Sequence, residues 1–187
     1  METLFKNKQQ ILSIIKKADD YTETQELILL FQKLKAKRKE FYITLDELDL
    51  ILRWKLRDQY NRQKSIRLKN TNDIVVAITK TAFSINHTDK EFETALKLKL
   101  LSTLVGVEIP VASAILTICY PELYSVIDVR NWRQVFPKEP QKNYYSTKEY
   151  WEYLNIIRDM AKKFELTPQQ IDLAIWQKDQ DKEENKN

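Results

Sequence analysis

The capping-box pattern, in which Ser or Thr is followed three residues later by Glu or Gln, recurs along the chain, and four of the segments that carry it help to delimit helices. This pattern marks the start of an α-helix, because the two side chains bind backbone N–H groups that lack partners in the first turn. The four segments begin at Thr44, Thr88, Ser146 and Thr167. Apolar residues then recur at steps of three and four, as on one face of a helix. The sequence therefore predicts an all-α protein, a compact helical domain.

The spacing of caps and apolar residues predicts nine helices, or ten if the short segment 61–69 is helical. The expected ranges are 3–17, 23–39, 45–58, 61–69, 72–84, 89–104, 110–119, 128–136, 147–164 and 168–178. The segment 74–83 is rich in β-branched residues, but its apolar residues keep the helical step. Two prolines, Pro137 and Pro140, predict a loop within the domain. We expect one domain over residues 1–177 and a disordered, charged tail over 178–187.

Composition excludes several classes of protein. The 187 residues are 43% hydrophobic, which is enough to form a core without disulfide bonds. Cys119 is the only cysteine and His87 the only histidine, so we expect no disulfide, no metal site and no cofactor. Gly106 is the only glycine, which excludes glycine-rich phosphate loops and predicts a positive φ at that residue. Without a leader or membrane-spanning run, we expect a cytoplasmic protein that does not enter membranes.

The segment from Leu96 to Phe136 is the most informative part of the chain. One apolar stripe precedes Gly106 and a second follows Pro110; they comprise Leu96, Leu100, Leu101 and Leu104, then Val111, Ile115 and Leu116. This arrangement predicts two helices joined by a tight hairpin, with the motif covering about residues 96–119. Such a turn directs backbone N–H groups and a helix N-terminus outward, which suits a DNA phosphate. The net charge of +4 also favours an anionic partner.

This segment resembles the helix-hairpin-helix DNA glycosylase superfamily, the HhH-GPD fold of base-excision repair. The family hairpin reads Leu-Pro-Gly-Val-Gly, three variable residues, then Ala, and this chain reads Leu104-Val105-Gly106-Val107-Glu108-Ile109-Pro110-Val111-Ala112. The family places an aspartate about twenty residues after the hairpin, and Asp128 follows Gly106 by 22 residues. The elements Arg53-Trp54-Lys55 and Leu173-Ala174-Ile175-Trp176 resemble a divergent bacterial branch of the family.

The resemblance implies a DNA-glycosylase-like fold and an enzyme that releases a modified or mismatched base from duplex DNA. The sequence does not determine the oligomeric state, and we expect a monomer. Asp128 would stabilise the oxocarbenium-like transition state and orient water. Family members that cleave the strand have a lysine where Pro110 stands, so the resemblance implies a monofunctional enzyme without lyase activity. The expected DNA contacts are Gly106, Val107, Glu108, Ile109, Val111, Ser113, Arg130 and Arg133. Trp54 and Trp132 are candidates for the walls of a base pocket.

Other interpretations of the same residues stay open. Asp128 also stands where a helix N-cap is expected, and the tryptophans are residues that often fill a core. Glu108 replaces the second glycine of the family hairpin, which favours a non-catalytic scaffold that binds DNA or a protein. In a third interpretation the hairpin serves only packing.

Overall fold

The computed structural model describes residues 4–18 and 21–184, and in these ranges every regular element is a helix. The helices are α1 (Lys8–Ile15), α2 (Tyr21–Lys37), α3 (Leu45–Leu56), the 3₁₀ helix η1 (Arg57–Gln63), α4 (Lys64–Arg67), α5 (Asn72–Ser84), α6 (Lys90–Leu101), α7 (Ile109–Cys119), α8 (Val129–Val135), α9 (Thr147–Phe164) and α10 (Pro168–Glu184). The predicted all-α class is confirmed. The β-branched segment is helix α5, and the segment expected at 61–69 is the end of η1 followed by α4.

Three of the four capping boxes form as the pattern predicts. Thr44 and Ser146 exchange reciprocal bonds with Glu residues at the third helical position of α3 and α9. Thr167 Oγ1 accepts the Gln170 N–H, and Gln170 Oε1 accepts the Thr167 N–H in return. The box expected at Thr88 is wrong by one residue. Asp89 caps α6 instead: its carboxylate accepts the Phe92 N–H at 3.0 Å.

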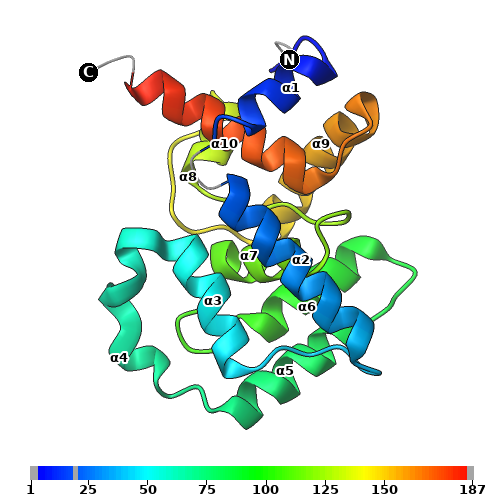
Figure 1. Cartoon of the computed structure of the whole chain (residues 1–187), viewed down its shortest axis with the longest axis vertical. Coiled ribbons are helices and arrows are strands. Elements are labelled where there is room, and N and C mark those ends of the chain that lie inside the picture. Colours follow the sequence, from blue (N-terminus) through cyan, green and yellow to red (C-terminus); the bar gives the residue numbers. More distant parts are fainter. Residues whose placement is uncertain (1–3, 19–20, 185–187) are drawn as a thin grey trace.

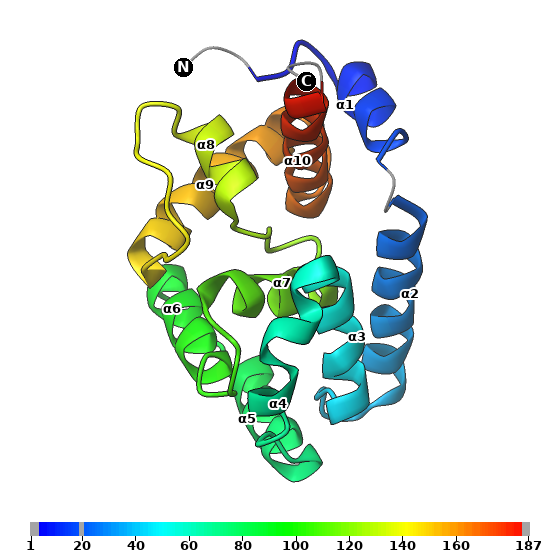
Figure 2. The same cartoon turned by 90° about the vertical axis from the view of Figure 1, so that its left-hand side faces the viewer.

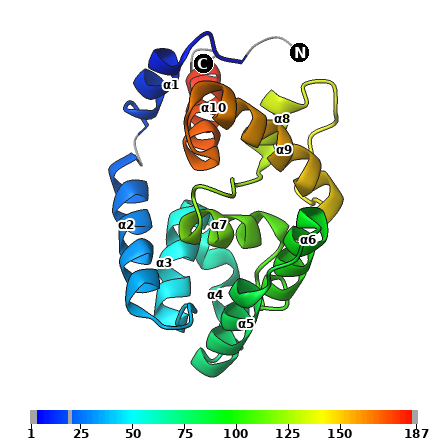
Figure 3. The ribbon, with the colours of Figure 1, turned by 90° about the vertical axis from the view of Figure 1, so that its right-hand side faces the viewer.

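Helix α7 is the centre of the molecule, and all of its residues from Val111 to Cys119 are buried. Figure 1 shows α7 in the middle of the molecule, and Figure 2 shows it between α2 and α3 on one side and α6 on the other. Figure 3 shows α1, α8, α9 and α10 gathered at one end of the molecule, and α5 at the other end. The chain leaves α7 and returns through residues 120–128 to the end that holds α10. Asp128 therefore lies at the junction of two groups of helices, the group of α1, α8, α9 and α10 at that end and the group around α7.

The charged segment from residue 178 does not form the expected disordered tail. Helix α10 continues to Glu184, and Asp179 in this part is 1% exposed. Arg133 on α8 binds the Asp179 carboxylate, and Lys178 Nζ donates to the Leu4 carbonyl oxygen. These contacts with α8 and with the start of the chain hold residues that composition alone describes as unstructured. Residues 185–187 of the expected tail lie outside the described part of the chain.

Candidate functional site

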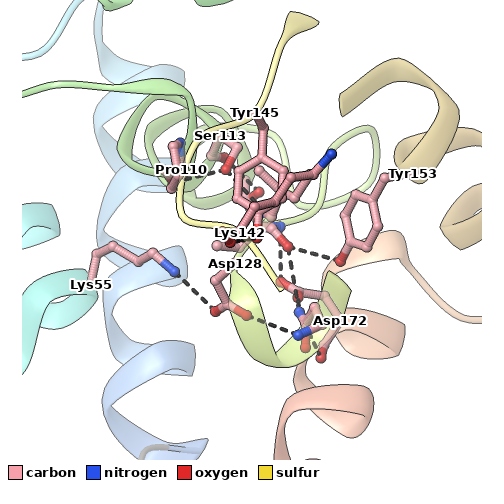
Figure 4. A network of polar contacts seen from close by, with 12 residues as sticks. Lys55, Pro110, Ser113, Asp128, Lys142, Tyr145, Tyr153 and Asp172 are labelled. Atoms are coloured by element: carbon pink, nitrogen blue, oxygen red, sulfur yellow. Dashed lines mark hydrogen bonds and ion pairs between the residues drawn. The ribbon is translucent and has the colours of Figure 1, made fainter. Parts of the chain in front are cut away.

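The extended segment that leads to Asp128 is attached to α7 through Ser113. The Ser113 hydroxyl donates to the Pro110 carbonyl oxygen at 2.8 Å and accepts the Ile127 N–H at 3.1 Å (Figure 4). Ser113 is fully buried. It was expected to contact DNA, and this is wrong for its side chain, because the hydroxyl is enclosed and used to hold the Asp128 segment.

Helices α9 and α10 hold the same segment from the other side. The Tyr150 hydroxyl donates to the Ser125 carbonyl oxygen at 2.9 Å, and the Tyr153 hydroxyl donates to that of Val126 at 2.8 Å. The Val126 N–H donates in turn to Asp172 Oδ2 at 3.0 Å. Every one of these groups is buried, so the bonds form in a medium where an unpaired polar group would be costly. The backbone before Asp128 is therefore fixed by three helices.

The Asp128 carboxylate has one partner on each oxygen. Oδ1 accepts the Asn131 N–H at 2.9 Å, which makes Asp128 the N-cap of α8 as the alternative interpretation expected. Oδ2 forms an ion pair with Lys55 Nζ of α3 at 3.1 Å (Figure 4). The Asp128 side chain is 21% exposed, so the carboxylate is neither sealed in the core nor bound only by its own helix.

Asn131 connects Asp128 to a second carboxylate through its backbone and its side chain. Its amide nitrogen donates to Asp172 Oδ1 on α10, while its backbone N–H holds Asp128.

Tyr145 belongs to the loop that precedes α9, and its hydroxyl donates to the Lys142 carbonyl oxygen at 2.8 Å. Burial, reinforced by the negative charge of Asp128, raises the pKa of Tyr145, so its phenol keeps its proton.

A small pocket opens beside Asp128, between α3 and α10. Its lining combines aromatic, cationic and acidic side chains: Trp54, Lys55, Arg57, Val126, Asp128, Gln169, Asp172, Leu173 and Trp176. Its volume is about 60 Å³, which holds a few water molecules but is far below the several hundred Å³ typical of ligand pockets. A nucleobase would enter only if side chains at the mouth moved.

The two tryptophans of the pocket are held in different ways. Trp54 is half-buried, and its Nε1–H donates to Thr24 Oγ1 at 2.9 Å. Trp176 has the Arg57 and Arg130 guanidinium groups near its ring, at 4.8 and 5.4 Å from the centroid. Trp54 thus lines the pocket beside Asp128. Trp132 does not, because it is 3% exposed and packs between the rings of Phe136 and Tyr145.

The two arginines expected to contact DNA bind an acidic side chain of the protein. Arg133 makes a two-pronged ion pair with Asp179, and Arg130 Nη1 lies 3.2 Å from Asp179 Oδ2. Burial alone would raise the pKa of Asp179, but the hydrogen bonds from Arg133 and Gln134 hold it below its ordinary value. Arg133 therefore fastens α8 to α10. Arg130 is 37% exposed and keeps one side toward solvent.

Gly106 has the predicted positive φ, 80°, in the turn between α6 and α7. The Asn70 side chain brackets this turn by donating to the Val105 carbonyl oxygen and accepting the Val105 N–H, each at 2.9 Å. The Val107 and Val111 side chains are buried, so only their backbone atoms can approach a ligand. In the part of the chain that the structure describes, the N–H groups of Glu108 and Ile109 donate to no protein group. The exposed Glu108 side chain stands beside them and makes no capping bond.

Sequence reasoning placed Asp128 and Trp54 at one site but did not predict that Lys55, Arg57 and Asp172 line the same pocket. Lys55 belongs to the Arg-Trp-Lys element of the resemblance. Arg57 follows the end of α3, where its φ of 45° turns the chain out of the helix. Asp172 lies in the first turns of α10, and no spacing rule connects it with Asp128. These residues meet only through the packing of α3, α8 and α10.

Comparison of the chain with known proteins identifies no similar protein. No protein-family model, no curated protein and no solved structure matches the chain. Among the described residues, none of the helices is long and apolar enough to cross a membrane. In the same ranges, no three His, Cys, Asp or Glu side chains gather as a metal-binding group.

Proposed function

We propose that this protein is a monofunctional DNA N-glycosylase, with Asp128 as the catalytic carboxylate. The observation that carries the proposal is the position of Asp128. A partly exposed carboxylate lines a pocket with Trp54 and Trp176, at the end of a segment that three helices hold in place. Fixed placement of this kind is what catalysis by a preorganised charge requires.

The chemistry follows from the charge that forms when an N-glycosidic bond breaks. The deoxyribose gains oxocarbenium-like positive charge, which a carboxylate beside C1′ stabilises, and the same group can orient the attacking water. A target base must first leave the duplex, and extruded bases stack on aromatic rings such as those of Trp54 and Trp176. The backbone N–H groups of Glu108 and Ile109 would hold a phosphate near the hairpin.

The absence of lyase activity is part of the proposal. Pro110 stands where strand-cleaving members of the superfamily that the segment resembles have a lysine, and proline has no primary amine to attack the sugar. Lys55 is an amine near Asp128, but its Nζ is held in the ion pair with the Asp128 carboxylate. Base release without strand cleavage is the expected outcome.

One observation favours a second candidate, a non-catalytic scaffold that binds DNA or a protein. The exposed Glu108 carboxylate stands beside the backbone N–H groups that would receive a phosphate, and like charges in that position repel. In this alternative Asp128 serves only as the N-cap of α8 and the partner of Lys55.

Incubation with a panel of duplexes separates these functions. The duplexes carry uracil, an alkylated purine, an oxidised purine or a mismatched adenine, and alkali converts the abasic product into a strand break. We expect product from at least one duplex, formed without strand cleavage before alkali, and a rate in Asp128→Asn at least ~100-fold lower. Asparagine keeps the N-cap of α8, so this variant loses the charge with little loss of the helix.

A matched control is available in α6. Asp89 caps that helix as Asp128 caps α8, and Asp89→Asn should leave base release unchanged. No product from any duplex, together with DNA binding that weakens steeply with salt, would identify the scaffold instead. If the protein does not bind DNA even at low salt, the remaining interpretation is a scaffold that binds another protein.

A further inference from the structure

The ion pair between Lys55 and Asp128 creates a conflict with the proposed chemistry. Lys55 reaches Asp128 from α3, across the junction between the two groups of helices, and its side chain is only 14% exposed. Asp128 Oδ1 is already used by the Asn131 N–H, so Lys55 holds the oxygen that is left for a substrate. A ligand that needs this oxygen must displace the ammonium group.

The conflict is electrostatic as well as steric. A sugar next to Asp128 Oδ2 would lie about as close to Lys55 Nζ as the carboxylate itself does, within ~5 Å. Two like charges at that separation repel strongly even in a partly solvated site, enough to slow glycosidic-bond cleavage by roughly 100-fold. Lys55 in its present position therefore opposes the reaction that Asp128 is proposed to assist.

The surroundings of Lys55 indicate where its charge can go. Lys55 and Arg57 line both the Asp128 pocket and the adjoining groove toward Arg130 and Trp176. The groove also holds the carboxylates of Asp58, Glu183 and Glu184, so the cations that border the mouth of the pocket are local and the groove as a whole is not basic. A nucleotide extruded into the pocket carries its flanking phosphates to this border. Lysine is a flexible point charge that binds phosphate readily and can exchange one anion for another.

We propose that Lys55 is a positioning residue that holds Asp128 in the empty pocket and transfers to a phosphate of the bound strand, releasing Asp128 Oδ2 for the deoxyribose. This inference rests on the proposed function, because it assigns the order in which that site binds and acts. It makes the free carboxylate depend on a ligand with a phosphate backbone. A lone nucleoside would leave Lys55 on Asp128.

The first test measures binding without chemistry. The probe is a duplex with a reduced abasic site, which cannot be hydrolysed, and its affinity is measured as a function of salt for wild type, Lys55→Met and Lys55→Arg. We expect Lys55→Met to bind about tenfold more weakly and to reduce the slope of log K against log[salt] by about one, with Lys55→Arg restoring the slope. Lys80→Met is the control, because Lys80 also forms an ion pair, with Glu40, and belongs to α5 at the far end of the molecule.

The second test uses single-turnover base release from the duplex on which the wild type acts. At saturating DNA, Lys55→Met should react within about threefold of wild type, because the wild-type lysine has already left Asp128. On the corresponding free nucleoside, Lys55→Met should react faster than wild type, by up to about 100-fold. A merely structural role for Lys55 would lower both rates.

Several results would overturn the inference. One is a binding curve for Lys55→Met that matches that of Lys80→Met. A second is a rate at saturating DNA more than about 100-fold below wild type, or a borohydride-trapped adduct between DNA and Lys55, which would make Lys55 a nucleophile. If no duplex releases a base, the proposed function is refuted independently of this inference. The slope of log K against log[salt] for the reduced abasic duplex then still decides whether Lys55 contacts a phosphate.

Discussion

Replacement of Asp179 by asparagine tests whether α10 holds the helix that begins at Asp128. Asp179 is 1% exposed and accepts hydrogen bonds from Arg133, Arg130 and Gln134, all on α8. In Asp179→Asn, one oxygen becomes an NH₂ group that faces the donors Arg133 Nη2 and Arg130 Nη1. Two charge-assisted bonds are lost, each worth about 1.5–3 kcal/mol, and both arginines lose the charge of Asp179, although Arg133 keeps Glu183 Oε1 at 3.5 Å.

We therefore expect Asp179→Asn to lower the free energy of unfolding by about 4 kcal/mol and Tm by about 10 °C for a chain of this length. Urea titration followed by circular dichroism measures the first quantity and a thermal scan the second. Asp159→Asn, at an exposed position of α9, is the control and should change stability by less than about 0.5 kcal/mol. A loss of under about 1 kcal/mol in Asp179→Asn would refute the argument that this network fastens α8 to α10.

Two further predictions concern other parts of the fold. Burial alone would raise the pKa of Glu93, but bonds from the His87 N–H, Lys90 and Lys97 lower it from 4.5 to about 2. A carboxyl whose pKa is lowered by folding stabilises the fold at pH values above its unfolded-state pKa, and this stabilisation is lost as the pH falls toward the folded-state pKa. Glu93→Gln should therefore lower the free energy of unfolding by about 3 kcal/mol at pH 7 and by about half of that near pH 3.3, measured by urea titration at each pH. An equal loss at the two pH values would contradict this. Gly106→Ala should lose about 1 kcal/mol in the same titration at pH 7, because φ 80° is unfavourable for alanine, and an unchanged midpoint would contradict the strain argument.

Local patterns were sufficient to predict most helices, because each pattern reports a local energy. Thr44 and Ser146 begin α3 and α9 because a capping box satisfies the first turn of a helix from residues within it. The positive φ of Gly106 is equally local, since only glycine takes it without a steric cost. The error at the start of α6 is local as well, because the N-cap is Asp89, the residue next to the expected Thr88.

The candidate site could be predicted only in part. Asp128 and its role as an N-cap were visible because the aspartate precedes a short amphipathic segment. The burial of Trp132 and Ser113 was not visible, because the same residue types serve equally well on a surface or in a core. Arg130 and Arg133 look like exposed cations in the sequence, and their partner Asp179 lies more than forty residues away.

The sequence by itself determined the helical class, the turn at Gly106 and the cap at Asp128, because these depend on neighbouring residues along the chain. Only the tertiary structure decided that Lys55 meets Asp128, that Trp54 and Trp176 line one pocket, and that the charged end of α10 stays helical. Contacts between distant residues depend on how whole helices pack, and the free energy of that packing is shared among side chains that no short pattern connects.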